Sequence, residues 1–243
     1  MILIDSGNST LKTQYCREGN LVASFSTSYQ PGWDQCLARW LKELPATSCT
    51  FASVLDSTRQ KLMDNCLADC FGPSVTRLLS QARSLGVTNG YSHPEQLGVD
   101  RWLALIAAAR ISSGDCIVVD AGSAITLDLL RSDGTHLGGA ILPGVNTTLE
   151  DFKRVFRHID FTDSAISQNQ HPGCSTEAAI QIEYGLDSIV RLSGLVNRWS
   201  GLFDEDAEII LAGGDAARIQ KIIEQPSRIV PDLVFQGMKL ILQ

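Results

Sequence analysis

The sequence lacks the features that mark several large classes of protein. It has only 4 histidines, and its 20 basic residues are outnumbered by 27 acidic ones, which gives a net charge of −7. A negative field repels phosphate backbones and anionic lipid, so we expect no nucleic-acid partner. The longest apolar run, residues 102–109, is far short of the roughly 20 residues that span a bilayer, and no basic leader precedes Asp5. We therefore expect neither a membrane segment nor a secretory signal.

Metal and disulfide signatures are also missing. The 7 cysteines are odd in number and contain no C-x-x-C, which favours reduced thiols and a cytoplasmic protein. Cys66 and Cys70 lie about one helical turn apart and could hold a metal, but no second pair of ligands follows, so packing is the favoured interpretation. The four histidines do not have metal-ligand spacing either. What is present, 44% hydrophobic residues in 243, indicates a folded chain of one large or two small domains.

An internal repeat organises the chain. Residues 2–8 read ILIDSGN and residues 117–123 read IVVDAGS, so the two aspartates are 120 − 5 = 115 positions apart. At the same offset Glu18-Gly19 falls on Asp133-Gly134. Each copy therefore predicts a buried strand, an Asp-x-Gly turn and a hairpin, with hairpin strands at 9–16, 21–26, 124–130 and 137–142.

Helical and strand patterns follow each hairpin. Apolar spacing predicts helices at 33–44, 57–70, 94–111 (interrupted early by Gly98), 147–156 and 176–199, with another beginning at Asp215. Further strands are expected at 50–55, 75–79 and 207–212, and a last apolar segment at 233–242. The pattern indicates an α/β protein with two duplicated lobes, residues 1–112 and 113–243.

The glycine turns are candidate phosphate sites. A glycine after a strand-ending aspartate lets backbone N–H groups approach an anion closely, and Lys12 on the next strand could add a positive charge. A single Asp-x-Gly is more often a simple hairpin corner, but two copies at matching positions favour a nucleotide site. Gly213-Gly214, between a strand and a helix, would form a further wall.

The segment Gly98-Val99-Asp100-Arg101 is the second candidate site. Asp100 and Arg101 stand where a glycine interrupts an apolar helical pattern, so they could be ordinary surface residues at a helix start. Alternatively, Asp100 could accept a proton from a substrate hydroxyl while Arg101 binds an anionic substrate group.

These residues together resemble the type III pantothenate kinases, of the actin-like and sugar-kinase-like ATPase superfamily. The match spans nearly the whole chain, and it rests on Asp5-Ser6-Gly7-Asn8-Ser9-x-x-Lys12, Gly98-Val99-Asp100-Arg101, Asp120-Ala121-Gly122-Ser123-Ala124-x-Thr126, Pro143-Gly144, Thr176 and Gly213-Gly214-Asp215. The family commonly has threonine where Ser9 and Ser123 stand, but serine keeps the hydroxyl. The resemblance implies two ribonuclease-H-like lobes with a nucleotide cleft between them.

The resemblance also implies residue roles. The ATP and phosphate contacts would be Asp5, Ser6, Gly7, Asn8, Ser9, Lys12, Ser123, Gly213 and Gly214. Pantothenate would be bound by Tyr91, Gly98, Val99, Asp100, Arg101 and Thr176, with Asp100 as the general base. Asp5 would lie near magnesium, bound through water, and Asp120 would face a monovalent cation, potassium or ammonium.

The reaction implied is ATP-dependent phosphorylation of pantothenate to 4'-phosphopantothenate, the first step of coenzyme A biosynthesis, by a homodimer. One alternative is a small-molecule kinase of the same superfamily with a sugar-type acceptor. The other is a nucleotide-binding regulatory factor without turnover, against which the Asp100-Arg101 pair argues because such a factor needs no base.

Overall fold

The computed structural model describes residues 1–157, 174–176, 190–203, 206–223 and 225–243. It divides into two compact units, Met1–Ala107 with Leu233–Gln243, and Ala108–Asp232. This division differs from lobes at 1–112 and 113–243 because the last helix, α7 (Leu233–Ile241), belongs to the first unit. Its apolar face, which includes Val234 and Met238, is buried in one cluster with Leu3.

The first unit is built on a five-stranded sheet in the order β3-β2-β1-β4-β5. Its strands are β1 (Ile2–Ser6), β2 (Thr10–Arg17), β3 (Asn20–Ser28), β4 (Cys49–Ser53) and β5 (Val75–Arg77). The hairpin strands β1, β2 and β3 are antiparallel, whereas β4 runs parallel to β1 and to β5. The unit also contains α1 (Trp33–Lys42), α2 (Ser57–Phe71), the ribbon β6 (Arg83–Ser84) and β7 (Val87–Thr88), η1 (Pro94–Gln96) and the start of α3 (Val99–Ile111).

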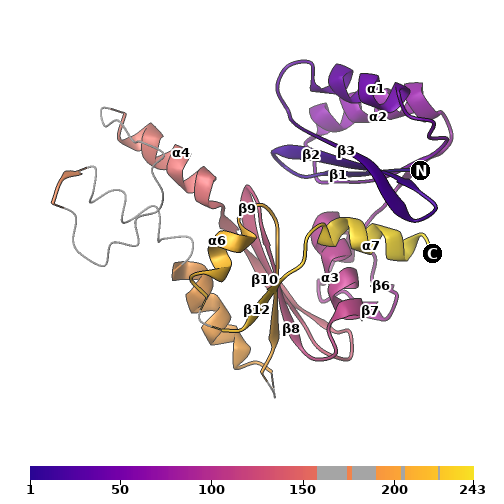
Figure 1. Cartoon of the computed structure of the whole chain (residues 1–243). Helices are drawn as coiled ribbons and strands as arrows, with labels where there is room; N and C mark the ends of the chain where they lie inside the picture. Colours follow the sequence, from indigo (N-terminus) through magenta and orange to yellow (C-terminus); the bar gives the residue numbers. More distant parts are fainter. Residues whose placement is uncertain (158–173, 177–189, 204–205, 224) are drawn as a thin grey trace. The chain divides into compact units, whose positions relative to one another are not determined.

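Side-chain alternation along β1 decides which helices cover each face of this sheet. Ile2 and Ile4 are buried with α1 and α2, which lie side by side on one face (Figure 1). Leu3 is buried with residues of α3 and α7 on the other. Because successive strand residues point to opposite faces, Asp5 lies on the Leu3 face, at the carboxyl end of β1.

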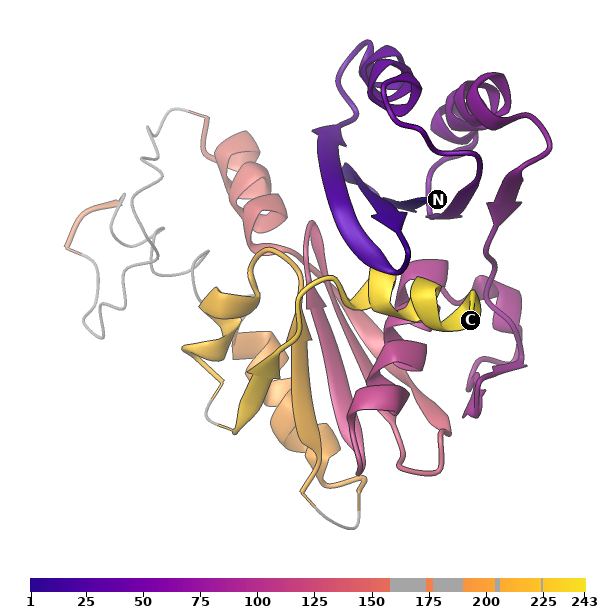
Figure 2. The ribbon, with the colours of Figure 1, turned by 45° about the vertical axis from the view of Figure 1, so that its right-hand side comes forward.

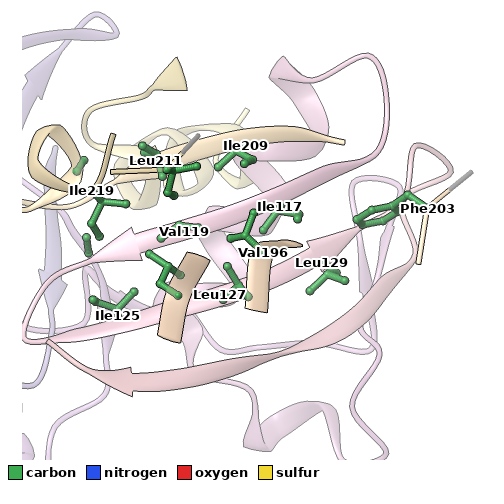
Figure 3. Close-up of a cluster of buried hydrophobic side chains, with 14 residues drawn as sticks. Ile117, Val119, Ile125, Leu127, Leu129, Val196, Phe203, Ile209, Leu211 and Ile219 are labelled. Carbon is green, nitrogen blue, oxygen red and sulfur yellow. The ribbon is translucent and has the colours of Figure 1, made fainter. Parts of the chain in front are cut away.

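The second unit repeats this topology, with a five-stranded sheet in the order β10-β9-β8-β11-β12. The strands are β8 (Cys116–Ala121), β9 (Ala124–Leu130), β10 (His136–Pro143), β11 (Glu208–Ala212) and β12 (Ser227–Ile229). Helices α4 (Val145–Val155), α6 (Ala216–Gln220) and a helical stretch over residues 190–200 accompany them (Figure 2). The core of the unit gathers Val119, Leu127 and Leu211 from the sheet with Val196 and Ile219 from these helices (Figure 3).

The two sheets confirm the predicted duplication. Asp5 pairs with Lys12 on one neighbouring strand and with Ala52 on the other. Asp120 holds the same position in the second sheet, opposite Thr126 and Ala212. The offset is not constant, however. It is 115 between the aspartates but 126 − 12 = 114 across the turn, because the second turn is one residue shorter.

The predicted elements are largely confirmed. The pattern at 94–111 is divided at Gly98, as its sequence indicates, into η1 and α3. The predicted helix 176–199 falls partly on 177–189, which lie outside the described residues. Across the part of the chain that the structure describes, no helix has the length and apolar character needed to cross a membrane.

Candidate functional site

Asp5 and Lys12 occupy adjacent positions on one face of the first sheet. They are directly opposite each other in the antiparallel pairing of β1 with β2, so their side chains share a face. Asp5 is half-buried and Lys12 is exposed. A carboxylate and an ammonium therefore stand together beside the first Asp-x-Gly turn, where Lys12 can reach an anion as a mobile point charge.

Ser6 differs from the prediction that groups it with the phosphate contacts. Its side chain is 1% exposed, and its hydroxyl donates to Sδ of Met63 at 3.5 Å. Since Ser6 follows Asp5 on the strand, it points to the α2 face instead. The hydroxyl of Ser6 is therefore buried, and it also interacts with the Tyr29 side chain, so its role in this structure is to support the turn from the α2 face.

Two side chains that sequence reasoning missed hold the first turn. The hydroxyl of Tyr29 donates to the carbonyl oxygen of Gly7 at 3.0 Å, and Nη1 of Arg59 donates to the carbonyl oxygen of Asn8 at 3.2 Å. The guanidinium also lies over the Tyr29 ring, with its Cζ 5.0 Å from the ring centroid. Neither residue belongs to an Asp-x-Gly pattern, so only the folded chain reveals them.

The second turn has an equivalent arrangement at Ser123. Its carbonyl oxygen accepts hydrogen bonds from N–H of Gly144 at 3.0 Å and from the hydroxyl of Thr147 at 2.6 Å. Ser123 occupies the position of Asn8 in the repeat, one residue after the turn glycine. The first turn of α4 thus fixes the Asp120 turn from the side of its carbonyl groups.

Position 213 requires glycine because no other residue fits there. Its φ is +86°, a left-handed conformation, and a Cβ added to it would lie 2.5 Å from Oδ1 of Asp120 and would also meet the carbonyl oxygen of Ala121. N–H of Asp215 donates to that same carbonyl at 3.1 Å. The Gly213-Gly214 turn is therefore packed directly against the Asp120 carboxylate.

Asp100 and Arg101 lie in the first turn of α3, and their side chains are held differently. Oδ1 of Asp100 accepts N–H of the next residue, Arg101, at 2.8 Å. A Cβ on Gly98 would lie 2.5 Å from that same oxygen, so glycine makes room for the carboxylate. Arg101 is only 6% exposed, and its Nη1 donates to the Tyr91 hydroxyl at 2.9 Å.

The loop that carries Tyr91 is fixed by Asn89, a third residue that sequence reasoning missed. The Asn89 side chain is buried, accepts N–H of Tyr91 at 3.0 Å, and donates to the carbonyl oxygens of Gln81 and Pro94, both at 3.2 Å. A buried amide with these bonds gives the loop one conformation. Tyr91 and Arg101 thus have a defined geometry relative to each other.

Two predicted substrate contacts behave differently from this cluster. Val99 is buried in the core with Leu3 and Leu103, so only its backbone can meet a ligand. Thr176 is exposed and belongs to the second unit, whereas Tyr91 and Gly98 to Arg101 belong to the first.

The described residues do not form a metal-binding cluster of three or more His, Cys, Asp or Glu side chains. A cation at Asp5 or Asp120 would therefore need water or ligand oxygens to complete its shell. Magnesium keeps several waters and binds one or two carboxylates together with phosphates, which this arrangement fits.

Comparison with known proteins gives a consistent result. A family model described as type III pantothenate kinase matches residues 1–198. The type III pantothenate kinase of Pseudomonas paraeruginosa (strain DSM 24068 / PA7) is 32% identical over 251 residues, with 99% of this chain and 98% of that protein covered.

Solved structures resemble the fold. A protein from Campylobacter jejuni, assigned to the Baf family of transcriptional activators, gives a TM-score of 0.60 at 24% identity and covers 100% of this chain and 97% of its own. The activator of the 2-hydroxyisocaproyl-CoA dehydratase from Clostridium difficile, with bound ADPNP, gives 0.55 at 12% identity, with 97% and 90% covered. Both support the two-lobed α/β fold and nothing further.

Proposed function

Because the chain belongs to the type III pantothenate kinase family, we propose that it transfers the γ-phosphoryl group of ATP to the primary hydroxyl of pantothenate. The product is 4'-phosphopantothenate, and the reaction is the first step of coenzyme A biosynthesis. The observation in the structure that best supports this acceptor is the Tyr91–Arg101–Asp100 cluster, which combines an anion-binding guanidinium with a carboxylate in one helix turn.

Arg101 binds the pantothenate carboxylate in this proposal. Its guanidinium is a planar fork suited to two parallel hydrogen bonds, and Tyr91 holds it through Nη1 and through a ring whose centroid is 5.7 Å from Cζ. Burial strengthens this interaction because little water competes for the fork. The carboxylate thereby fixes one end of the substrate.

Asp100 acts as the general base. As the hydroxyl oxygen of pantothenate bonds to the γ-phosphorus, the bond from that phosphorus to the β–γ bridging oxygen breaks, and the hydroxyl proton passes to the Asp100 carboxylate. N–H of Arg101 keeps that carboxylate oriented. Positioning supplies most of the rate, with proton acceptance adding to it.

The two Asp-x-Gly turns provide the phosphate contacts. In the first unit Asn8 and Ser9 present backbone and hydroxyl donors, Gly7 lets the phosphates approach the backbone because it has no side chain, and Lys12 adds a charge. Ser123, with Gly213 and Gly214, provides these contacts in the second. Ser6 and Val99 contribute through their backbones, because their side chains are buried.

Cations would be held beside the two turn aspartates. Asp5 is a single half-buried carboxylate, which suits magnesium held through water, and Asp120 suits a monovalent cation, potassium or ammonium. When bound, magnesium neutralises charge that develops on the transferred phosphoryl group. We also propose a cytoplasmic homodimer; unbridged thiols at Cys16, Cys49 and Cys66 suit a reducing compartment.

The decisive experiment measures ADP release with pantothenate as acceptor and with sugars and N-acetylhexosamines as controls, in potassium, ammonium and sodium-only buffers. We expect turnover with pantothenate alone, and we expect potassium or ammonium to be required. A carboxylate beside phosphate is unfavourable unless a cation screens it, so Asp120 should make the activity depend on the cation. In Asp120→Asn this dependence, or the activity itself, should be lost. Turnover with a sugar would favour the sugar-type alternative, ATP binding without turnover would favour a regulatory factor, and equal rates in sodium for both proteins would refute the cation site.

A further inference from the structure

We propose that Tyr29 and Arg59 are positioning residues for the nucleotide: they hold two consecutive carbonyl groups of the first turn so that the next N–H groups face the phosphates. The inference rests on the proposed function, since it concerns the same ATP site. We call the pair, with the carbonyl oxygens of Gly7 and Asn8, the turn clamp.

Topology brings the clamp to the turn from two distant segments. Ser28, the last residue of β3, pairs with Thr10, the first residue of β2, so Tyr29 comes directly alongside the turn. Arg59 comes from a different segment, because β4 runs parallel to β1 and leads into α2, and its guanidinium lies over the Tyr29 ring. The carboxyl ends of parallel strands meet at one edge of a sheet, which is where ligands bind in open α/β sheets.

Peptide geometry links the clamp to the phosphates. In a trans peptide C=O and N–H point in opposite directions, and the described chain contains no cis peptide bond. With the Gly7 carbonyl held by Tyr29, N–H of Asn8 points away from the tyrosine. With the Asn8 carbonyl held by Arg59, N–H of Ser9 points away from the guanidinium. Two successive N–H groups directed away from the clamp form the anion-binding concavity that phosphates occupy.

Each clamp side chain is itself fixed. The Tyr29 ring packs edge-on against Trp33, with centroids 5.1 Å apart and planes at 88°. Burial also raises the pKa of the Tyr29 hydroxyl above its ordinary value, so it stays a donor at any assay pH. Arg59 is bound by Asp56, the N-cap of α2, through Nε to Oδ2 at 3.5 Å.

The neighbouring charge argues against Arg59 as a direct phosphate ligand. The Asp56 carboxylate, whose pKa is lowered first by the backbone N–H of Arg59, stays ionised and offsets the guanidinium charge. The bond from Nη1 to the Asn8 carbonyl uses the fork to orient the backbone. The equivalent carbonyl of the second turn, that of Ser123, is held in the same sense by Gly144 and Thr147. Holding this carbonyl is thus a feature of both copies.

The test measures the dissociation constant for ATP without pantothenate, and the Michaelis constants for both substrates, in Tyr29→Phe, Arg59→Met and Arg59→Lys. Tyr29→Phe keeps the ring and removes the hydroxyl that donates to Gly7, so we expect weaker ATP binding by about 3- to 10-fold, with an unchanged Michaelis constant for pantothenate. We expect a similar loss in both arginine variants, because an ammonium cannot bridge the Asn8 carbonyl and Asp56 as a planar fork does.

Tyr15→Phe and Arg39→Met are the matched controls. Tyr15 is a core tyrosine opposite Ile2, at the other end of β2, and Arg39 is exposed in the last turn of α1. Both should bind ATP as wild type does. Wild-type affinity for ATP in Tyr29→Phe would overturn the clamp. Wild-type affinity for ATP in Arg59→Lys would also overturn it, by showing that Arg59 acts through its charge. Because ATP binding is measured alone, a wild type that binds ATP but does not phosphorylate pantothenate would refute the proposed function and leave the clamp test intact.

Discussion

Replacing Asp100 with asparagine separates chemistry from structure at the acceptor site. Asparagine has nearly the same volume and keeps an Oδ1, so it can still accept N–H of Arg101, the bond that Asp100 makes at 2.8 Å. The change removes the negative charge and the basic oxygen. We therefore expect a folded protein that binds ATP normally but has lost its proton acceptor.

The two effects differ greatly in size. A charge in the first turn of a helix contributes about 0.3–1 kcal/mol to stability, which corresponds to a fall in Tm of at most about 4 °C in a chain of this length. Loss of a general base lowers turnover by roughly 10²- to 10⁴-fold, or about 3–5 kcal/mol in the activation free energy. The catalytic effect should therefore far exceed the effect on stability.

Steady-state ADP release measures turnover, ATP titration measures nucleotide affinity, and thermal unfolding measures stability. Arg101→Lys is the comparator, because it replaces a fork held by Tyr91 with a point charge and should mainly raise the Michaelis constant for pantothenate. If Asp100→Asn turned over within a few-fold of wild type, Asp100 would be a structural helix-start residue. If it lost ATP binding, the assignment of its role to the acceptor side would be wrong.

Two further predictions follow from glycine packing and thiol burial. Gly213→Ala should lower the free energy of unfolding by about 2–5 kcal/mol in denaturant titrations, since it forces a left-handed alanine against the Asp120 carboxylate. Gly7→Ala should instead weaken ATP binding with little change in stability, and equal stability of the two variants would contradict this prediction. Burial raises the pKa of the thiols of Cys49, Cys66 and Cys116 to about 12, so their alkylation should stay slow up to strongly alkaline pH while exposed cysteines react at pH 8. Mass spectrometry of labelled peptides measures both rates, and rapid labelling of these three cysteines in the native protein would refute the prediction.

Sequence patterns predicted the elements that depend on local periodicity and on the repeat. The Asp-x-Gly hairpins, the break at Gly98 and the helix that Asp56 caps all rest on residues close together in the chain. The strand β12 and the β6–β7 ribbon were not predicted, because three residues in β12 and two in each of β6 and β7 are too few to show a strand pattern. The place of α7 in the first unit could not be predicted, because the apolar pattern of a helix does not indicate which core the helix packs against.

The residues of the candidate site also differ in whether the sequence alone could identify them. Residues in contiguous motifs, such as Asp5 and Asp100, could be selected from the sequence. Tyr29, Arg59 and Asn89 could not, because each reaches its partner through tertiary structure: Arg59 is 51 positions from the Asn8 carbonyl that it binds. The motifs thus supply the groups that would meet the ligand, while residues distant in the chain fix the direction of those groups.

Glycine shows why identical letters in a motif can have different causes. Gly213 has φ of +86° and no room for a Cβ, so the fold itself requires it. At Gly7 an added Cβ would make an ordinary contact with the carbonyl oxygen of Thr10 at 3.4 Å, and its φ is not left-handed. Since the protein alone could accommodate alanine at Gly7, the proposed function gives a reason for the glycine: the phosphates of ATP would approach the backbone there.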